Sequence, residues 1–151
     1  MNTLVRSWTP LEEAYQGYLI THSESISIAD YLSIKVNGNI CYRPTVFYAY
    51  RPCDAAILSI HELNGKNFKL QSNRRILMED IFDGTDELGV LIMGHTKNIY
   101  WYGSVLSIKE ARELAPNNNA TSLQVAAGVI SGMIWAIENP EMGIIEPEDM
   151  P

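Results

Sequence analysis

The stretch Asp83–Ser104, DGTDELGVLIMGHTKNIYWYGS, carries the clearest folding pattern in this 151-residue chain. An apolar run, Val90–Met93, is followed by a polar connection, Gly94–Asn98, and by an aromatic run, Ile99–Tyr102. Two short runs rich in β-branched and aromatic residues, on either side of a glycine-containing loop, are typical of paired strands. We therefore expect a buried strand around Leu91, then a loop, then a half-buried aromatic strand.

Acidic side chains crowd the entrance of this stretch, at Asp83, Asp86 and Glu87. Clustered carboxylates repel one another unless a cation lies among them, so a small amine could bind there. A solvated acidic turn is the simpler interpretation, and the residues alone favour it. For His95 and Lys97, together with the aromatic strand, a hairpin loop and a half-buried strand are likewise favoured over a site.

Upstream, the pattern predicts short elements. Thr9–Glu12 has a capping residue, a proline and an acid in the order of a helix start, and Gly17 would end that helix. Tyr18–Ile20 would then be a strand. Apolar residues alternate over Ile26–Val36, which predicts a second strand of period two. Asn37-Gly38 is a strong hairpin signal because both positions tolerate positive φ.

The return strand of that hairpin is predicted over Ile40–Tyr50, with an edge position or a bulge at Pro44. A helix is expected over Asp54–Leu63 and a short strand over Phe68–Gln71. Ser107–Glu110 has the pattern of a capping box that opens a helix ending at Pro116.

A long helix is expected to follow Asn117–Asn119, with Gly128 and Gly132 spaced for the close approach of another backbone. Together these elements predict an α+β fold in which a mixed or antiparallel sheet packs against helices, as a single partial domain over residues 1–151.

The composition excludes several classes of function. A net charge of −7 and an isoelectric point near 4.9 provide no basic stripe for phosphates, so we expect no nucleic acid partner. Cys41 and Cys53 are too few for a disulfide framework and the amino terminus has no apolar signal segment, which together indicate the cytoplasm. The apolar run Leu123–Ile137 is shorter than a span of about 20 residues, so we expect a buried core helix and no membrane.

His22 and Glu24 are the first candidates for chemistry. On an extended chain the side chains at i and i+2 point to the same side, which would bring the imidazole beside the carboxylate. Such a pair can exchange protons with an amine and bind an ammonium group. A hydrogen-bonded histidine beside a solvated glutamate explains the same spacing, and the residues alone favour it. No histidine or cysteine pair has metal-ligand spacing, so no metal site is expected.

Four long blocks of the chain carry a family resemblance: LITHSESISIADY (19–31), YRPTVFYAYRPCDAAILSIHEL (42–63), DELGVLIMGHTKNIYWYGSVLSIKEAREL (86–114) and ATSLQVAAGVISGMIWAIENPEMGIIEPEDM (120–150). They closely resemble consecutive segments of bacterial homospermidine synthases, which belong to the saccharopine dehydrogenase-like group. The similarity runs from Asn2 to Met150 and corresponds to the later portion of a much longer protein.

This resemblance implies an aminobutyl transferase that makes homospermidine from putrescine in polyamine biosynthesis, with NAD as a prosthetic group. In the family, NAD takes hydride from putrescine to give an imine, a second diamine displaces ammonia, and the hydride is returned. The chain has no GxGxxG strand-turn-helix, so the resemblance implies that NAD is bound mainly by an amino-terminal Rossmann domain that these residues lack. The chain is therefore expected to be inactive alone, and the full-length enzyme to be a homodimer.

By motif position, the resemblance assigns a catalytic role to His22 and substrate-binding roles to Glu24 and Asp86. Glu87 remains an alternative to Asp86 if the alignment slips by one residue. The cofactor-binding residues are unknown. Two other interpretations stay open: a non-catalytic remnant or oligomerisation module built on the long helix, and a saccharopine dehydrogenase-like oxidoreductase that acts on another amine or on an amino acid.

Overall fold

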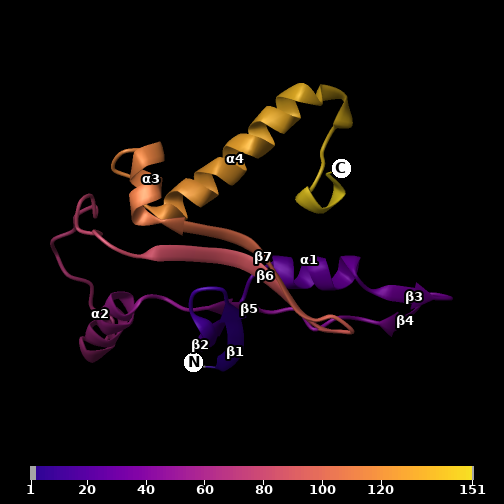
Figure 1. Cartoon of the computed structure of the whole chain (residues 1–151), viewed down its shortest axis with the longest axis horizontal. Helices are drawn as coiled ribbons and strands as arrows, with labels where there is room; N and C mark the ends of the chain where they lie inside the picture. Colours follow the sequence, from indigo (N-terminus) through magenta and orange to yellow (C-terminus); the bar gives the residue numbers. More distant parts are fainter. Residues whose placement is uncertain (1–2, 151) are drawn as a thin grey trace. The chain divides into compact units, whose positions relative to one another are not determined.

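The structure, a computed structural model, describes residues 3–150 (Figure 1). It divides into two compact units, Met1–Ser72 with Glu146–Pro151, and Asn73–Ile145. All strand pairings among the described residues are antiparallel, which confirms the expected α+β class. In chain order the elements are β1 (Leu4–Thr9), β2 (Glu13–Ile20), α1 (Glu24–Tyr31), β3 (Ile34–Val36), β4 (Asn39–Tyr42), β5 (Tyr48–Tyr50), α2 (Asp54–Gly65), β6 (Thr85–His95), β7 (Asn98–Ser107), α3 (Ile108–Leu114), α4 (Ala120–Glu138) and two short 3₁₀ turns, Pro140–Met142 and Pro147–Asp149.

The first unit is built on a three-stranded sheet of order β1-β2-β5. β1 and β2 form a hairpin whose register runs from Leu4 opposite Tyr18 to Thr9 opposite Glu13. The predicted helix from Thr9 to Gly17 is therefore wrong. A Thr-Pro pair suits the corner of a tight turn as well as a helix start, and pairing with β1 satisfies the backbone of the following residues. The strand predicted over Tyr18–Ile20 is confirmed as the end of β2.

The predicted strand over Ile26–Val36 is also wrong for most of its length. Residues 24–31 form helix α1, and only Ile34–Val36 are extended, as β3. Alternating apolar residues over so short a run fit a helix as well as a strand. Local bonds decide the outcome: the hydroxyl of Ser25 donates to the His22 carbonyl at 2.6 Å and that of Ser33 to the Ala29 carbonyl at 2.7 Å.

The Asn37-Gly38 hairpin is confirmed, with positive φ at both residues (50° and 80°) between β3 and β4. The return strand is interrupted, because β4 ends at Tyr42 and β5 begins at Tyr48, with Pro44 in the irregular segment between them. The helix expected from Asp54 is confirmed as α2 and runs two residues further than predicted.

The strand predicted over Phe68–Gln71 is wrong, because these residues are irregular and Asn67 and Phe68 have positive φ, 51° and 60°. Left-handed backbone at the start of the run ends α2 and prevents the extended conformation that a strand needs.

The second unit begins with the β6–β7 hairpin, in which Leu91 lies opposite Trp101. Both strands are longer than predicted, and only Thr96 and Lys97 separate them. The expectation that Leu91 lies in a buried strand is wrong for the described residues: Leu91 is half-buried, and its neighbours Val90 and Ile92 are 55% and 50% exposed.

Two glycines face each other across this hairpin, Gly89 opposite Gly103. A Cβ added to Gly89 would lie 2.5 Å from the indole Cζ2 of Trp101 and 2.8 Å from the Tyr102 carbonyl oxygen. A Cβ on Gly103 would lie well under 3.0 Å from the Leu88 carbonyl oxygen. The indole of Trp101 therefore lies over the backbone of Gly89 and Gly103, where a side chain larger than hydrogen would clash.

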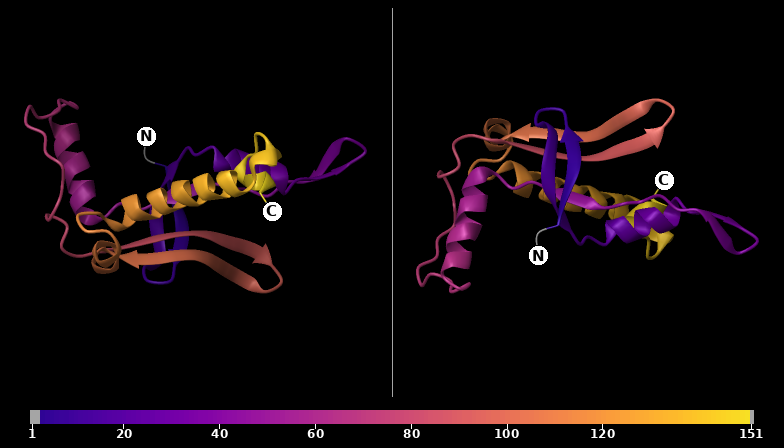
Figure 2. Two further views of the ribbon diagram at one scale, coloured as in Figure 1. Left: turned by 90° about the horizontal axis from the view of Figure 1, so that it is seen from above. Right: turned by 90° about the horizontal axis from the view of Figure 1, so that it is seen from below.

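α3 and α4 follow the hairpin, and both begin at side-chain caps. Ser107 and Glu110 form the predicted capping box of α3, and the Asn119 side chain accepts from the Ser122 amide at the start of α4. α4 is a single unbroken helix that leaves the hairpin beyond its first turns (Figures 1 and 2).

The expected burial of α4 is wrong within the described chain, because Ala120 is its only buried residue. Most of its large apolar side chains are instead exposed, with Val129 57% and Ile134 51% exposed. By length and composition α4 could also cross a membrane, with a mean hydropathy of 1.5. A single helix of this kind is weak evidence for a membrane, because the core helix of a soluble protein passes the same test.

The described chain leaves much apolar surface uncovered. Few apolar residues are buried among those described, and most of them are small: Ala29, Ile108, Ala111 and Ala120. The accessible surface is 12652 Å² for 17.0 kDa. A compact domain of this mass would expose about 7,700 Å², and two separate domains of half the mass about 9,300 Å². The excess is larger than the whole of a standard protein interface, about 1,600 Å².

Candidate functional site

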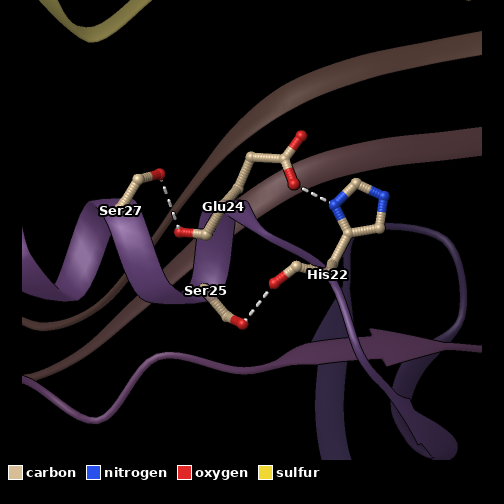
Figure 3. A network of polar contacts seen from close by, with 4 residues as sticks. All are labelled: His22, Glu24, Ser25 and Ser27. Carbon is tan, nitrogen blue, oxygen red and sulfur yellow. Dashed lines mark hydrogen bonds and ion pairs between the residues drawn. The ribbon is translucent and has the colours of Figure 1, made fainter.

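His22 and Glu24 come together at the start of α1, in the first unit. The imidazole Nδ1 contacts a carboxylate oxygen of Glu24 directly (Figure 3). The sequence predicted this pair on an extended strand, but β2 ends at Ile20 and Glu24 is the first residue of a helix. The pairing is therefore confirmed and its predicted conformation is wrong. A tight entry into a helix can bring i and i+2 side chains together as a strand does.

Local bonds hold this entry in place. The Ser25 amide and hydroxyl both bond to the His22 carbonyl, at 3.1 Å and 2.6 Å, and the Ile26 amide bonds to the Ser23 carbonyl at 2.9 Å. The backbone on either side of His22 is thus fixed by its own turn. The side chains of His22 and Glu24 are 44% and 57% exposed, so both can reach a ligand from solvent.

Tyr48 is a site neighbour that sequence reasoning missed. Its ring stacks on the His22 imidazole, with centroids 4.9 Å apart and planes inclined by 23°. Tyr48 opens β5 and pairs with Ile20, two residues before His22. No local signal predicts the contact, because it depends on how β5 pairs with β2. The stacked ring and the Glu24 carboxylate together fix the orientation of the imidazole.

The pKa of the Glu24 carboxyl lies below its ordinary value, first because of backbone hydrogen bonding at the helix start and second because of the His22 bond. We expect His22→Ala to raise this pKa toward its usual range, since that change removes the second cause. Carbon-detected NMR titration of the Glu24 carboxyl would measure it. Ser27→Ala is the control, because the Ser27 hydroxyl donates to the Glu24 carbonyl and not to the carboxylate. An unchanged pKa in His22→Ala would contradict the role given to the imidazole.

Asp86 lies in the second unit, as the second residue of β6. Its Oδ2 accepts a hydrogen bond of 2.9 Å from the hydroxyl of Thr121, in the first turn of α4. The side chain is half-buried. Adjacent strand residues point to opposite faces, so Glu87 points away from the face that carries Asp86 and Thr121. The two acids that the sequence could not separate therefore have different surroundings.

Of the remaining candidates, Lys97 lies in the hairpin loop and His95 ends β6, and the Lys97 amide donates to His95 Nδ1 at 3.1 Å. This local bond supports the loop interpretation. Asp83 likewise accepts a bond of 2.8 Å from the next amide, that of Gly84, as a turn residue does.

The residues that the structure describes include no cluster of three His, Cys, Asp or Glu side chains that could hold a metal ion. They also do not fit a dinucleotide. A dinucleotide site needs a parallel β-α-β unit with a glycine-rich turn, and the strands described here pair only in antiparallel fashion.

The sequence profile of the saccharopine dehydrogenase C-terminal domain matches residues 3–151. The chain belongs to this family. It is 58% identical to a homospermidine synthase of Blastochloris viridis and 52% identical to one of Mesorhizobium japonicum, each over 151 residues. The crystal structure of the homospermidine synthase of Legionella pneumophila in complex with NAD is similar over 97% of the chain, with 56% identity and a TM-score of 0.89.

These similarities confirm the resemblance that the sequence blocks suggest. The chain spans 31% of the length of each of the two relatives and 32% of the Legionella structure. About two thirds of each of those proteins therefore has no counterpart in this chain.

Proposed function

We propose that this chain is the carboxyl-terminal, substrate-binding and catalytic portion of an NAD-dependent homospermidine synthase, which makes homospermidine from putrescine. The observation that carries the proposal is an identity of 52–58% to homospermidine synthases over 99% of the chain. Residues 1–151 then act as one partial domain without a dinucleotide site. We further propose that the complete enzyme is a cytoplasmic homodimer that acts apart from membranes and nucleic acid.

The residues of this chain have two tasks in the proposal. Glu24 in the first unit and Asp86 in the second are each substrate-binding carboxylates, which accept charge-assisted hydrogen bonds from ammonium groups. His22 moves protons during amine exchange: it takes a proton from the attacking ammonium, so that the neutral amine can add to the imine, and returns one to the leaving nitrogen. NAD supplies the hydride chemistry and is bound by the portion that precedes this region in the relatives.

The uncovered apolar surface supports the proposal that this chain works together with a separate NAD-binding portion. A helix with as many exposed apolar side chains as α4 is stable in water only when other elements cover them. We propose that the amino-terminal portion covers α4 and the apolar positions of the β6–β7 hairpin, among them Val90, Ile92 and Tyr102, which are 50% to 72% exposed. Polar contacts at the start of α4, such as Thr121 to Asp86, favour a protein partner over lipid.

A chimera tests the proposed function. The region of the Blastochloris viridis synthase that matches this chain is replaced by residues 1–151, and the product of putrescine and NAD is analysed by mass spectrometry. We expect homospermidine. The intact relative is the positive control, and the relative truncated before the matched region is the negative one.

A soluble chimera that binds NAD and forms no homospermidine would overturn the proposal. Co-expression of the truncated relative and residues 1–151 as separate chains then tests whether the covalent link is needed. We expect homospermidine only when both chains are present.

A second candidate function is a non-catalytic oligomerisation module, favoured by the exposure of α4. Gly128 and Gly132 have nothing within 4 Å of an added Cβ, so another backbone could approach there. A stable homo-oligomer of the chain in sedimentation, together with an inactive chimera, would favour this candidate.

A further inference from the structure

A polar seam joins the first two turns of α4 to one face of the β6–β7 hairpin. Thr121 donates to Asp86 at 2.9 Å, and the Ser104 hydroxyl donates to the Gln124 side-chain oxygen at 3.2 Å. Thr121 and Gln124 are three apart on the helix and share a face. Asp86 and Leu88 are two apart on β6 and share a face, and Ser104 lies opposite Leu88. The two contacts therefore set one register between helix and hairpin.

The start of α4 is fixed independently of Asp86. Asn119 caps the helix through the Ser122 amide at 2.8 Å, and Ala120 is buried. The Gln124 side-chain nitrogen is also buried, and it has no hydrogen-bond partner within the described part of the chain. Sliding of the helix along the hairpin would break the Ser104–Gln124 hydrogen bond, which therefore helps to hold the register. Thr121 is thus presented to Asp86 by a rigid support.

We propose that Thr121 is a positioning residue that orients Asp86 for an ammonium group of the diamine. This inference rests on the proposed function. Thr121 donates to Oδ2, while Oδ1 takes part in none of the hydrogen bonds found among the described residues. A carboxylate held by one oxygen loses less side-chain freedom when the other binds an ammonium group.

The Thr121 hydroxyl, not the bulk of the side chain, carries this role. Thr121→Val removes the hydroxyl and keeps the β-branched shape, so the carboxylate of Asp86 is freed at little cost in packing. In the active chimera we expect the KM for putrescine to rise about threefold to tenfold, with kcat within twofold of the parent. Thr121→Ser, which keeps the hydroxyl, is expected to restore the parent KM.

Two further variants separate the outcomes. Ser122→Ala removes a hydroxyl from the same helical turn, away from Asp86, and is expected to leave KM and kcat unchanged. Asp86→Asn removes the charge, and Thr121→Val added to it is expected to change KM no further, since the two residues act through one contact. Calorimetric titration of putrescine into each variant provides a second measurement that does not depend on turnover.

The results distinguish this inference from the function on which it rests. A raised KM in Asp86→Asn with an unchanged KM in Thr121→Val would overturn the positioning role and leave the proposed function intact. A parent KM in Asp86→Asn, with a raised KM in Glu87→Gln, would overturn the choice of acid. If Thr121→Val lowers both kcat and the melting temperature, and Thr121→Ser restores neither, the contact has only a structural role.

Discussion

Replacing His22 with alanine in the active chimera is expected to lower turnover by about 10²–10⁴-fold, the usual contribution of a positioned acid-base group. The imidazole is held by Glu24 on one side and stacked on Tyr48 on the other, so its orientation does not depend on the substrate. If it moves protons during amine exchange, the loss will fall on kcat more than on KM. Steady-state kinetics with putrescine measures both.

A matched histidine provides the control for this experiment. His61 is exposed on α2 and has no role in the proposed chemistry, so His61→Ala is expected to retain the parent turnover. Free imidazole added to the assay should partly restore the turnover of His22→Ala, because the variant leaves space where the ring was. Parent kcat in His22→Ala would remove the residue from the catalytic group.

The His22–Glu24 pair also shows how far sequence reasoning reaches into the site. The two residues and their proximity were predicted, because they are two apart and any tight local conformation brings them together. The conformation was not, because the choice between a strand and a helix over residues 24–31 rests on serine-backbone bonds that an alternating apolar pattern does not indicate.

The residues that support the candidate site could not be predicted from the sequence. Tyr48 contacts His22 through the pairing of β5 with β2, and Thr121 contacts Asp86, which lies 35 positions earlier in the chain. Neither contact has a local signature, since each depends on the register between elements that loops connect. The family resemblance points to Asp86 but does not point to its hydrogen-bond partner.

For the fold, the correct predictions are those in which a local bond decides the element. Asn37-Gly38 forms its hairpin, and Ser107 with Glu110 forms its capping box, because each motif satisfies its own backbone groups. The Thr9–Glu12 prediction failed since a helix start and a tight turn share the same residues, and pairing of β1 with β2 decides between them. The predicted burial of α4 failed for another reason: among the described residues, few pack against the helix beyond its first turns, and Ala120 is its only buried residue.

Substitution of Gly103 by alanine is expected to destabilise the protein by about 1–3 kcal/mol, as overpacking does when no flexible side chain can move aside. The added methyl would meet backbone first, the Leu88 carbonyl oxygen and the Gly89 Cα, and then Trp101 Cζ2 at 2.8 Å. Relief requires the two strands to separate where the hairpin is most closely paired. The midpoint of urea unfolding of the chimera should fall, and tryptophan fluorescence should show the indole displaced.

Two comparisons make the origin of this loss clear. Gly65→Ala, at the end of α2, adds a methyl that meets nothing within 4 Å, and it is expected to change stability by no more than about 0.5 kcal/mol. Trp101→Leu in the Gly103→Ala background removes the indole but leaves the backbone clash, so it should recover only part of the loss. Full recovery of the stability would mean that the added methyl clashes only with the indole. An unchanged stability in Gly103→Ala would contradict the close approach of the two strands.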